Sequence, residues 1–170
     1  TATITLEVNL GNGSKAFLIA YVTVIGNEIT LNGGPYSNST FRDDESAMAA
    51  WLESEGVMTI SFFAAGPIGE EIMVYLTYPG AKTGLEPWTE QTCSILTFHN
   101  INDEIYQSGH MMNMNPPVIH PGYVNVTRYD KESGILSGTF GGNISIGKAC
   151  VDEDCITYGT VEGTFVARTN

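Results

Sequence analysis

The sequence predicts a single all-β domain over residues 1–170, built as an antiparallel β-sandwich or lipocalin-like barrel. Short segments with alternating or β-branched apolar residues recur along the chain, and Gly and Asn, which form turns, separate them. The hydrophobic fraction of 42% is enough for one core in a chain of 170 residues. Strands are not followed regularly by long helices, so a βαβ fold is not expected. We expect about eight to ten strands.

The clearest strand signal is the period-two alternation at the start of the chain. Ile4, Leu6 and Val8 alternate with polar residues, as in a half-buried strand. The run over residues 15–25 is more continuously apolar, which favours a strand that is covered on both faces. Further strands are predicted over residues 28–31, 57–65, 71–78, 92–100, 123–129, 134–146 and 157–168.

One helix is predicted, near residues 43–55. This segment is rich in Ala, Glu, Met and Leu, with Asp43 or Asp44 available as the N-cap and Gly56 as the stop. Ala47, Met48, Trp51 and Leu52 recur at spacings of three and four, which would place them on one face. We expect a short helix over one end of the sandwich or barrel.

The charge of the chain excludes two classes of partner. Nineteen Asp and Glu residues oppose seven Lys and Arg residues, for a net charge of −12. Such a surface repels phosphate backbones and anionic lipid, so we expect neither nucleic-acid binding nor membrane-surface docking. No apolar run approaches the length of a membrane-spanning helix. The sequence starts directly in a strand pattern at Ala2, so an export signal is expected upstream of Thr1, and contact with a membrane is expected only if a lipid anchor also lies there.

Three cysteines point to an oxidising compartment. Cys150 and Cys155 bracket four residues, a spacing at which a disulfide could close a short loop. Closing so small a ring would stabilise the fold by at most about 2 kcal/mol. Cys93 lies in an apolar run and is expected to be a buried, inert thiol.

The last third of the chain carries a recognisable pattern in residues 122–130 (GYVNVTRYD), 131–140 (KESGILSGTF) and 156–167 (ITYGTVEGTFVA). It resembles the C-terminal half of uncharacterised small lipoproteins and secreted proteins of Bacteroidetes-type bacteria. The resemblance implies an extracytoplasmic all-β domain, often behind a lipidated cysteine, and no particular activity. Read physically, the motif predicts a hairpin in which Asp130 bonds the following backbone and Gly134 has positive φ.

Two glycines of this pattern fall in the middle of predicted strands. A glycine there marks a bulge, a bend, or an aromatic ring lying across bare backbone, and this applies to Gly138 and Gly163. Phe140 and Phe165 are expected to point inward. The motif is therefore interpreted as part of the folding pattern.

No arrangement of residues typical of an enzyme is found. None of the three histidines lies near a Gly-x-Ser-x-Gly elbow, and Cys93 has no catalytic signature around it. The acidic residues that could serve a glycosidase, such as Glu70, Glu71, Asp103 and Glu104, fall at strand ends, where solvated charges are common. We therefore expect a non-enzymatic protein without a cofactor.

The segment 110–121 (HMMNMNPPVIHP) departs from the strand rhythm because its prolines forbid a central strand. His110, Met112 and His120 offer imidazole and thioether ligands that suit copper. The alternative is that the methionines fill gaps over the core and the histidines are ordinary loop residues. No metal site is included in the main hypothesis.

The main functional hypothesis is an extracytoplasmic binding or structural module, in the periplasm or on the cell surface, with a small molecule, glycan or protein as ligand. Loop aromatics could instead stack on sugar rings, as in a carbohydrate-binding module, and a periplasmic copper-binding protein is the other alternative. Sites on β scaffolds are usually carried by loops. The predicted ligand-binding residues are therefore Trp88, Tyr106, His110, Met112 and His120.

Overall fold

The computed structural model confirms the all-β prediction. It describes residues 2–9, 15–22, 26–34, 36–43, 47–52, 56–66, 71–89, 95–99, 104–108, 120–147 and 157–169. Within these ranges the chain forms thirteen strands and no helix.

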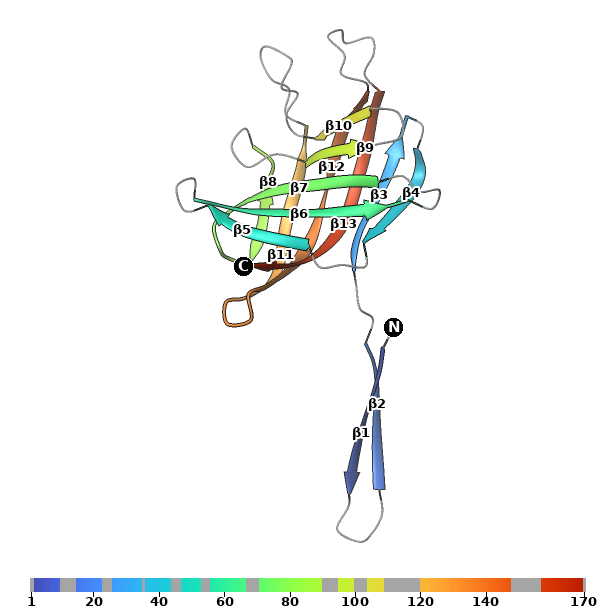
Figure 1. Ribbon diagram of the computed structural model, residues 1–170, viewed down its shortest axis with the longest axis vertical. Coiled ribbons are helices and arrows are strands. Elements are labelled where there is room, and N and C mark those ends of the chain that lie inside the picture. Colours follow the sequence, from blue (N-terminus) through green and yellow to red (C-terminus); the bar gives the residue numbers. More distant parts are fainter. Residues whose placement is uncertain are drawn as a thin grey trace.

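The first two strands form a hairpin that lies apart from the rest of the molecule. β1 (Ala2–Asn9) and β2 (Lys15–Val22) pair antiparallel, with Leu6 opposite Leu18. An ion pair of 2.6 Å joins Lys15 Nζ to Glu7 Oε1 across the hairpin. Among the described strands these two pair only with each other, and the turn end of the hairpin points away from the other strands (Figure 1).

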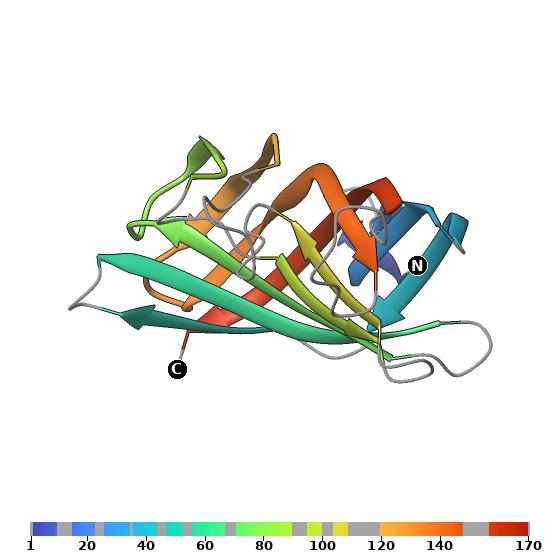
Figure 2. The ribbon, with the colours of Figure 1, turned by 90° about the horizontal axis from the view of Figure 1, so that it is seen from above.

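The remaining eleven strands are arranged in two layers, which Figure 2 shows from above. The first layer contains, in spatial order, β8 (Gly84–Pro87), β11 (Gly122–Asp130), β12 (Ile135–Gly147), β13 (Thr157–Thr169), β3 (Asn27–Gly33) and β4 (Tyr36–Asp43). The second layer contains β5 (Ala47–Leu52), β6 (Val57–Ala65), β7 (Glu71–Pro79), β9 (Ile95–His99) and β10 (Glu104–Ser108).

Two long strands join the layers because each changes its neighbour along its length. β13 pairs with β3 over residues 160–164 and then with β5 over residues 167–169, the one parallel pairing among the described strands. β12 pairs with β11 over residues 135–142 and then with β10 over residues 145–147. Since β12 and β13 also pair with each other, the hydrogen-bonded strands close into a ring. The fold is therefore a sandwich joined on both sides, which is a flattened barrel.

The space between the layers is filled by side chains from alternate positions of the strands. Ile72, Val74, Leu76 and Tyr78 of β7 are all fully buried, as the period of two requires. The ring of Phe62 on β6 lies against the ring of Phe140, which belongs to the first layer. Other large buried side chains are Ile29, Leu31, Phe41, Met58, Ile60, Phe140, Ile144 and Phe165.

Two contacts tie the layers together across this core. The ring centroids of Phe62 on β6 and Phe140 on β12 lie 6.3 Å apart. The hydroxyl of Tyr78 donates a hydrogen bond of 2.9 Å to the carbonyl oxygen of Gly84 at the start of β8. Burial raises the pKa of Tyr78, which keeps its hydroxyl protonated and able to donate.

The two mid-strand glycines each lie beneath an aromatic ring, one of the possibilities expected from the sequence. Gly163 on β13 is directly opposite Phe140 on β12, and Gly138 is directly opposite Phe165. A Cβ added at Gly163 would lie 2.5 Å from Cε1 of Phe140, and one at Gly138 would lie 2.8 Å from Cζ of Phe165. Both phenylalanines are buried, as predicted. Glycine is required at these positions because the rings occupy the space of a side chain.

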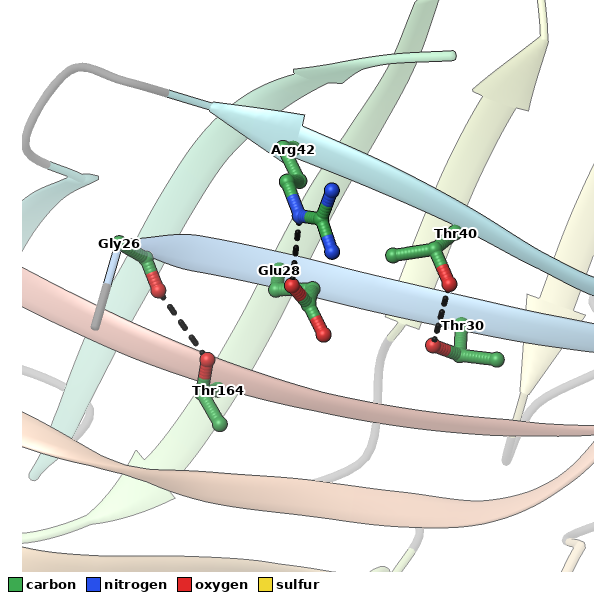
Figure 3. A network of polar contacts seen from close by, with 6 residues as sticks. All are labelled: Gly26, Glu28, Thr30, Thr40, Arg42 and Thr164. Carbon is green, nitrogen blue, oxygen red and sulfur yellow. Dashed lines mark hydrogen bonds and ion pairs between the residues drawn. The ribbon is translucent and has the colours of Figure 1, made fainter. Parts of the chain in front are cut away.

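Over β3 and β4, the outer surface of the first layer carries polar side chains that are joined by hydrogen bonds and an ion pair (Figure 3). Arg42 on β4 and Glu28 on β3 form an ion pair of 2.8 Å. The hydroxyls of Thr30 and Thr40 are 3.2 Å apart on the same two strands. Each such pair contributes little stability on a solvated face. Because its side chains are polar or charged, this surface is suited to contact with water.

A buried asparagine holds the corner at which β13 leaves β3 for β5. Oδ1 of Asn27 accepts a hydrogen bond of 2.8 Å from the backbone N–H of Val166, between the two pairing segments of β13. Nδ2 of Asn27 donates to Oδ2 of Asp43 at 3.1 Å. Beside it, the hydroxyl of Thr164 donates to the carbonyl oxygen of Gly26 at 3.1 Å (Figure 3). Side chains thus pair backbone groups that the strands leave open at this corner.

The helix predicted near residues 43–55 is wrong. Residues 47–52 form strand β5, which pairs with β6 on one side and with β13 on the other. Ala47 and Ala49 are buried while Met48 and Ala50 are exposed, which is the alternation of a strand. The helix propensity of Ala, Met and Leu amounts to a few tenths of a kcal/mol per residue, and pairing on both edges outweighs it.

The hairpin between β11 and β12 has the predicted turn chemistry. Oδ1 of Asp130 accepts hydrogen bonds from the backbone N–H groups of Glu132 at 3.1 Å and Ser133 at 3.2 Å. These bonds, chiefly those from Ser133, lower the pKa of Asp130. Gly134 has a φ of 67°, a backbone conformation that residues with a side chain rarely adopt.

Candidate functional site

The structure describes two of the five predicted ligand-binding side chains. Tyr106 lies on β10, where its backbone is paired with Thr97 on β9 and Ile146 on β12, and its side chain is outside the description. His110 and Met112 fall outside the described residues, as do Cys93, Cys150 and Cys155. The copper and disulfide hypotheses that involve them stay predictions.

Trp88 is packed inside the molecule. Its side chain is 6% exposed and belongs to the core cluster. A Cβ added at Gly142 would lie 2.5 Å from Cζ3 of its ring, and a Cβ at Gly122 would also meet the ring. The backbone N–H of Trp88 donates to the carbonyl oxygen of Gly122 at 3.0 Å. The ring therefore covers two glycines of β11 and β12, and its ligand-binding role stays a prediction.

Tyr36, the first residue of β4, is also buried. Its ring meets that of Phe41 edge-on, with centroids 5.8 Å apart. A sugar platform requires an open ring face. Because both rings are buried, neither Tyr36 nor Trp88 offers an open ring face.

His120 lies where β12 passes from β11 to β10. The next residue, Pro121, accepts a hydrogen bond of 2.9 Å from the backbone N–H of Asn143 at this point. The His120 side chain is 6% exposed, and its ring meets Tyr158 of β13 edge-on with centroids 5.8 Å apart. Burial lowers the pKa of His120, so the imidazole is neutral at pH 7.

This burial makes stability depend on pH. As the pH falls through about 6.5, His120 takes up a proton in the unfolded chain, while in the folded chain it stays neutral until a lower pH. The free energy of unfolding is therefore expected to be lower at pH 5.5 than at pH 7.5. Urea unfolding of His120→Gln across this range should show a shallower fall than that of the parent. Since His99 and His110 are present in both proteins, equal slopes would contradict the assignment to His120.

The described residues contain no group of three His, Cys, Asp or Glu side chains that could hold a metal ion. His120 alone cannot form such a site, because metal sites in proteins commonly use three or four protein ligands. A copper site at this corner would need ligands from the part of the chain that lies outside the description.

A surface that the sequence analysis missed lies on the outer face of the second layer. Met48 on β5 is 63% exposed, and Phe63 on β6 is 64% exposed. Met73 and Tyr75 on β7 are half-buried beside them. The strand registers bring these residues together: Met48 and Tyr75 flank Ser61, and Phe63 is opposite Met73. We call Met48, Phe63, Met73 and Tyr75 the outer apolar face.

This face differs in its charge from the surface of the first layer over β3 and β4, which carries the ion pair of Glu28 and Arg42. Between β5 and β7 its outward positions also include Ala50, Thr59, Ser61 and Thr77, which carry no charge. Charged side chains described near it stand at its margins, with Glu71 at the start of β7 and Arg168 beside Met48. Exposed apolar side chains that gather in this way usually mark an interaction surface.

The sequence does contain a signal for this face. Residues 57–65 (VMTISFFAA) place apolar residues at both odd and even positions, so one apolar set must face outward whichever set faces the core. The core takes Met58, Ile60, Phe62 and Ala64. Phe63 is therefore left on the outside.

No family model, curated protein or solved structure matches the chain. Among the described residues, no helix has the length and apolar character that crossing a membrane requires.

Proposed function

We propose that this protein is an extracytoplasmic, non-enzymatic module that binds protein through the outer apolar face. The observation that carries the proposal is the cluster of exposed apolar side chains between β5 and β7, which contrasts with the ion-paired surface over β3 and β4. Glu28 and Arg42 are ion-paired on the first layer, whereas Met48 and Phe63 are exposed on the second. Leaving two such side chains in water has a cost that binding would remove, at about 25 cal/mol per Å² of apolar surface covered.

Three features of the sequence support the extracytoplasmic part of the proposal. Cys150 and Cys155 have a spacing suited to a disulfide, which persists only in an oxidising compartment. The last third resembles secreted proteins and lipoproteins. The net charge of −12 keeps a β-rich protein soluble and repels nucleic acid.

The proposal can be tested with Nile red, a neutral dye that becomes fluorescent on apolar surfaces. At nanomolar protein concentration, the folded chain is expected to increase the dye emission. Phe63→Ser should reduce this increase by at least half and leave the free energy of unfolding within about 0.5 kcal/mol of the parent. Leu85→Ser is the matched control, because Leu85 is 62% exposed but lies on β8 of the first layer. Dye binding that is equal in all three proteins, or absent, would refute the proposal.

Copper binding is a second candidate function. The buried His120, at the place where β12 passes from β11 to β10, favours it. A neutral imidazole is the form that binds metals, and His120 ends the segment that carries His110 and Met112. Thermal unfolding with Cu(I), Cu(II), Ca²⁺, Zn²⁺ and common glycans distinguishes the two functions. A ligand present at about 100 times its dissociation constant stabilises a protein by about 2.7 kcal/mol. Protein binding predicts no shift with this panel. A shift with copper that His110→Ala and Met112→Ala abolish would favour the copper site.

A further inference from the structure

The two strands of the N-terminal hairpin, β1 and β2, pair only with each other among the described strands. Ile4, Leu6 and Val8 occupy alternate positions of β1, and the register pairs these positions with Ala20, Leu18 and Ala16 of β2. Paired positions share one side of a two-stranded ribbon, so this side consists entirely of apolar residue types. We call it the apolar side of the hairpin. An isolated two-stranded hairpin is marginally stable at best in water, so this one requires a surface to pack on.

We infer that the hairpin of one chain packs on the outer apolar face of a second copy, and that two copies exchange hairpins to form a symmetric dimer. The inference rests on the proposed function and names its partner. Both surfaces belong to this chain, and the charged side chains described near the outer apolar face, Glu71 and Arg168, stand at its margins. In Figure 1 the hairpin points away from its own β5–β7 layer, which favours the exchange over packing within one chain.

The distribution of charge supports a second copy as the partner. Residues 2–22 carry one negative and one positive side chain, Glu7 and Lys15, and these form an ion pair. The hairpin is therefore neutral, and the net charge of −12 resides in the rest of the chain. Two acidic barrels repel each other when they meet face to face. A neutral hairpin can approach the outer apolar face without this penalty and keeps the barrels apart.

The area of contact explains why the exchange would be reciprocal. Eight residues per strand make a ribbon about 26 Å long and about 10 Å wide. One side of it covers about 260 Å², so one hairpin on one face buries about 500 Å² of surface in total. Two such contacts bury about 1,000 Å², the lower limit for a specific interface. A single contact, or two hairpins packed against each other, would fall short of that limit.

Analytical ultracentrifugation of the whole chain at micromolar concentration tests the inference. The parent is expected to form dimers. Phe63→Ser on the face and Leu18→Ser on the hairpin should each raise the dimer dissociation constant by about 30-fold or more, the loss typical of a central interface residue. Leu85→Ser, the control outside both surfaces, should leave it unchanged.

Other outcomes identify what is wrong. Dimers weakened by Leu18→Ser but not by Phe63→Ser would mean that hairpins pair with each other, which overturns the inference. A monomer whose dye binding appears only in Leu18→Ser would mean that the hairpin covers its own face, which also overturns it. A monomer that binds Nile red through Phe63 would refute the second copy as partner and leave the proposed function standing. A monomer that binds no dye in any variant would refute both.

Discussion

Replacing Gly163 by alanine is expected to lower the free energy of unfolding by about 3 kcal/mol. The new Cβ would lie 2.5 Å from Cε1 of Phe140 and 2.5 Å from the backbone oxygen of Glu28. The ring cannot move away easily, because it is fully buried between the layers and lies against Phe62. The neighbouring backbone cannot move without breaking the pairing of β13 with β3. Urea unfolding followed by fluorescence or circular dichroism measures the loss.

The control for this experiment is Gly56→Ala. A Cβ at Gly56 would meet nothing within 4 Å, but its φ of 66° disfavours a side chain. That conformation alone costs about 1 kcal/mol. A loss at Gly163 that does not exceed the loss at Gly56 would show that Phe140 does not occupy the space above Gly163.

Removal of the Asn27 side chain should cost about 2 kcal/mol. Asn27 is 1% exposed, and in Asn27→Ala the N–H of Val166 and the carboxylate of Asp43 would each lose a hydrogen bond. A backbone donor buried without a partner retains its full cost of desolvation. Two measurements apply: urea unfolding for the total loss, and hydrogen exchange at the Val166 amide, which should become faster relative to other amides of β13.

Thr30→Ala provides the comparison on the same strand. Thr30 bonds Thr40 on the outer surface of the first layer, where water can replace the lost partner. Its loss is expected to be about 0.5 kcal/mol. If Asn27→Ala costs no more than Thr30→Ala, the side chain does not hold the corner of the barrel.

The sequence predicted the parts of the fold that depend on local chemistry. Alternation of apolar residues predicted the strands over 71–78 and 134–146, and the turn residues predicted the hairpin at Asp130 and Gly134. It did not predict β5, β8 or β10, which are short. β4 was also missed, because it has Ser, Asn and Thr in place of most apolar residues. β5, β8 and β10 each pair with a strand much later in the chain, β13, β11 and β12 respectively, and local pattern carries no information about such partners.

The burial of the candidate site residues could not be predicted from local sequence patterns either. Trp88 and His120 were predicted to bind ligand because they fall in or near proline-bearing loops. Their burial depends on contacts with β11, β12 and β13, which the local sequence does not reveal. The exposure of Phe63 was not predicted, because a phenylalanine in a strand is expected to face the core. Its exposure follows from the occupation of the inward positions by Phe62 and Ala64. Which of two apolar sets faces outward is decided by the register of the whole sheet.

The position of β13 has a consequence for biosynthesis. This strand contacts β12, β3 and β5, and it is the last of the thirteen described strands to be made. Until it emerges from the ribosome or an export channel, β3 and β5 lack the neighbour that joins them, and the ring of strands stays open. Pairings between residues more than a hundred positions apart form slowly, and these cannot start until β13 has been synthesised. The earlier strands must therefore wait with unpaired edges, which makes them natural clients for a chaperone that holds nascent β-rich chains.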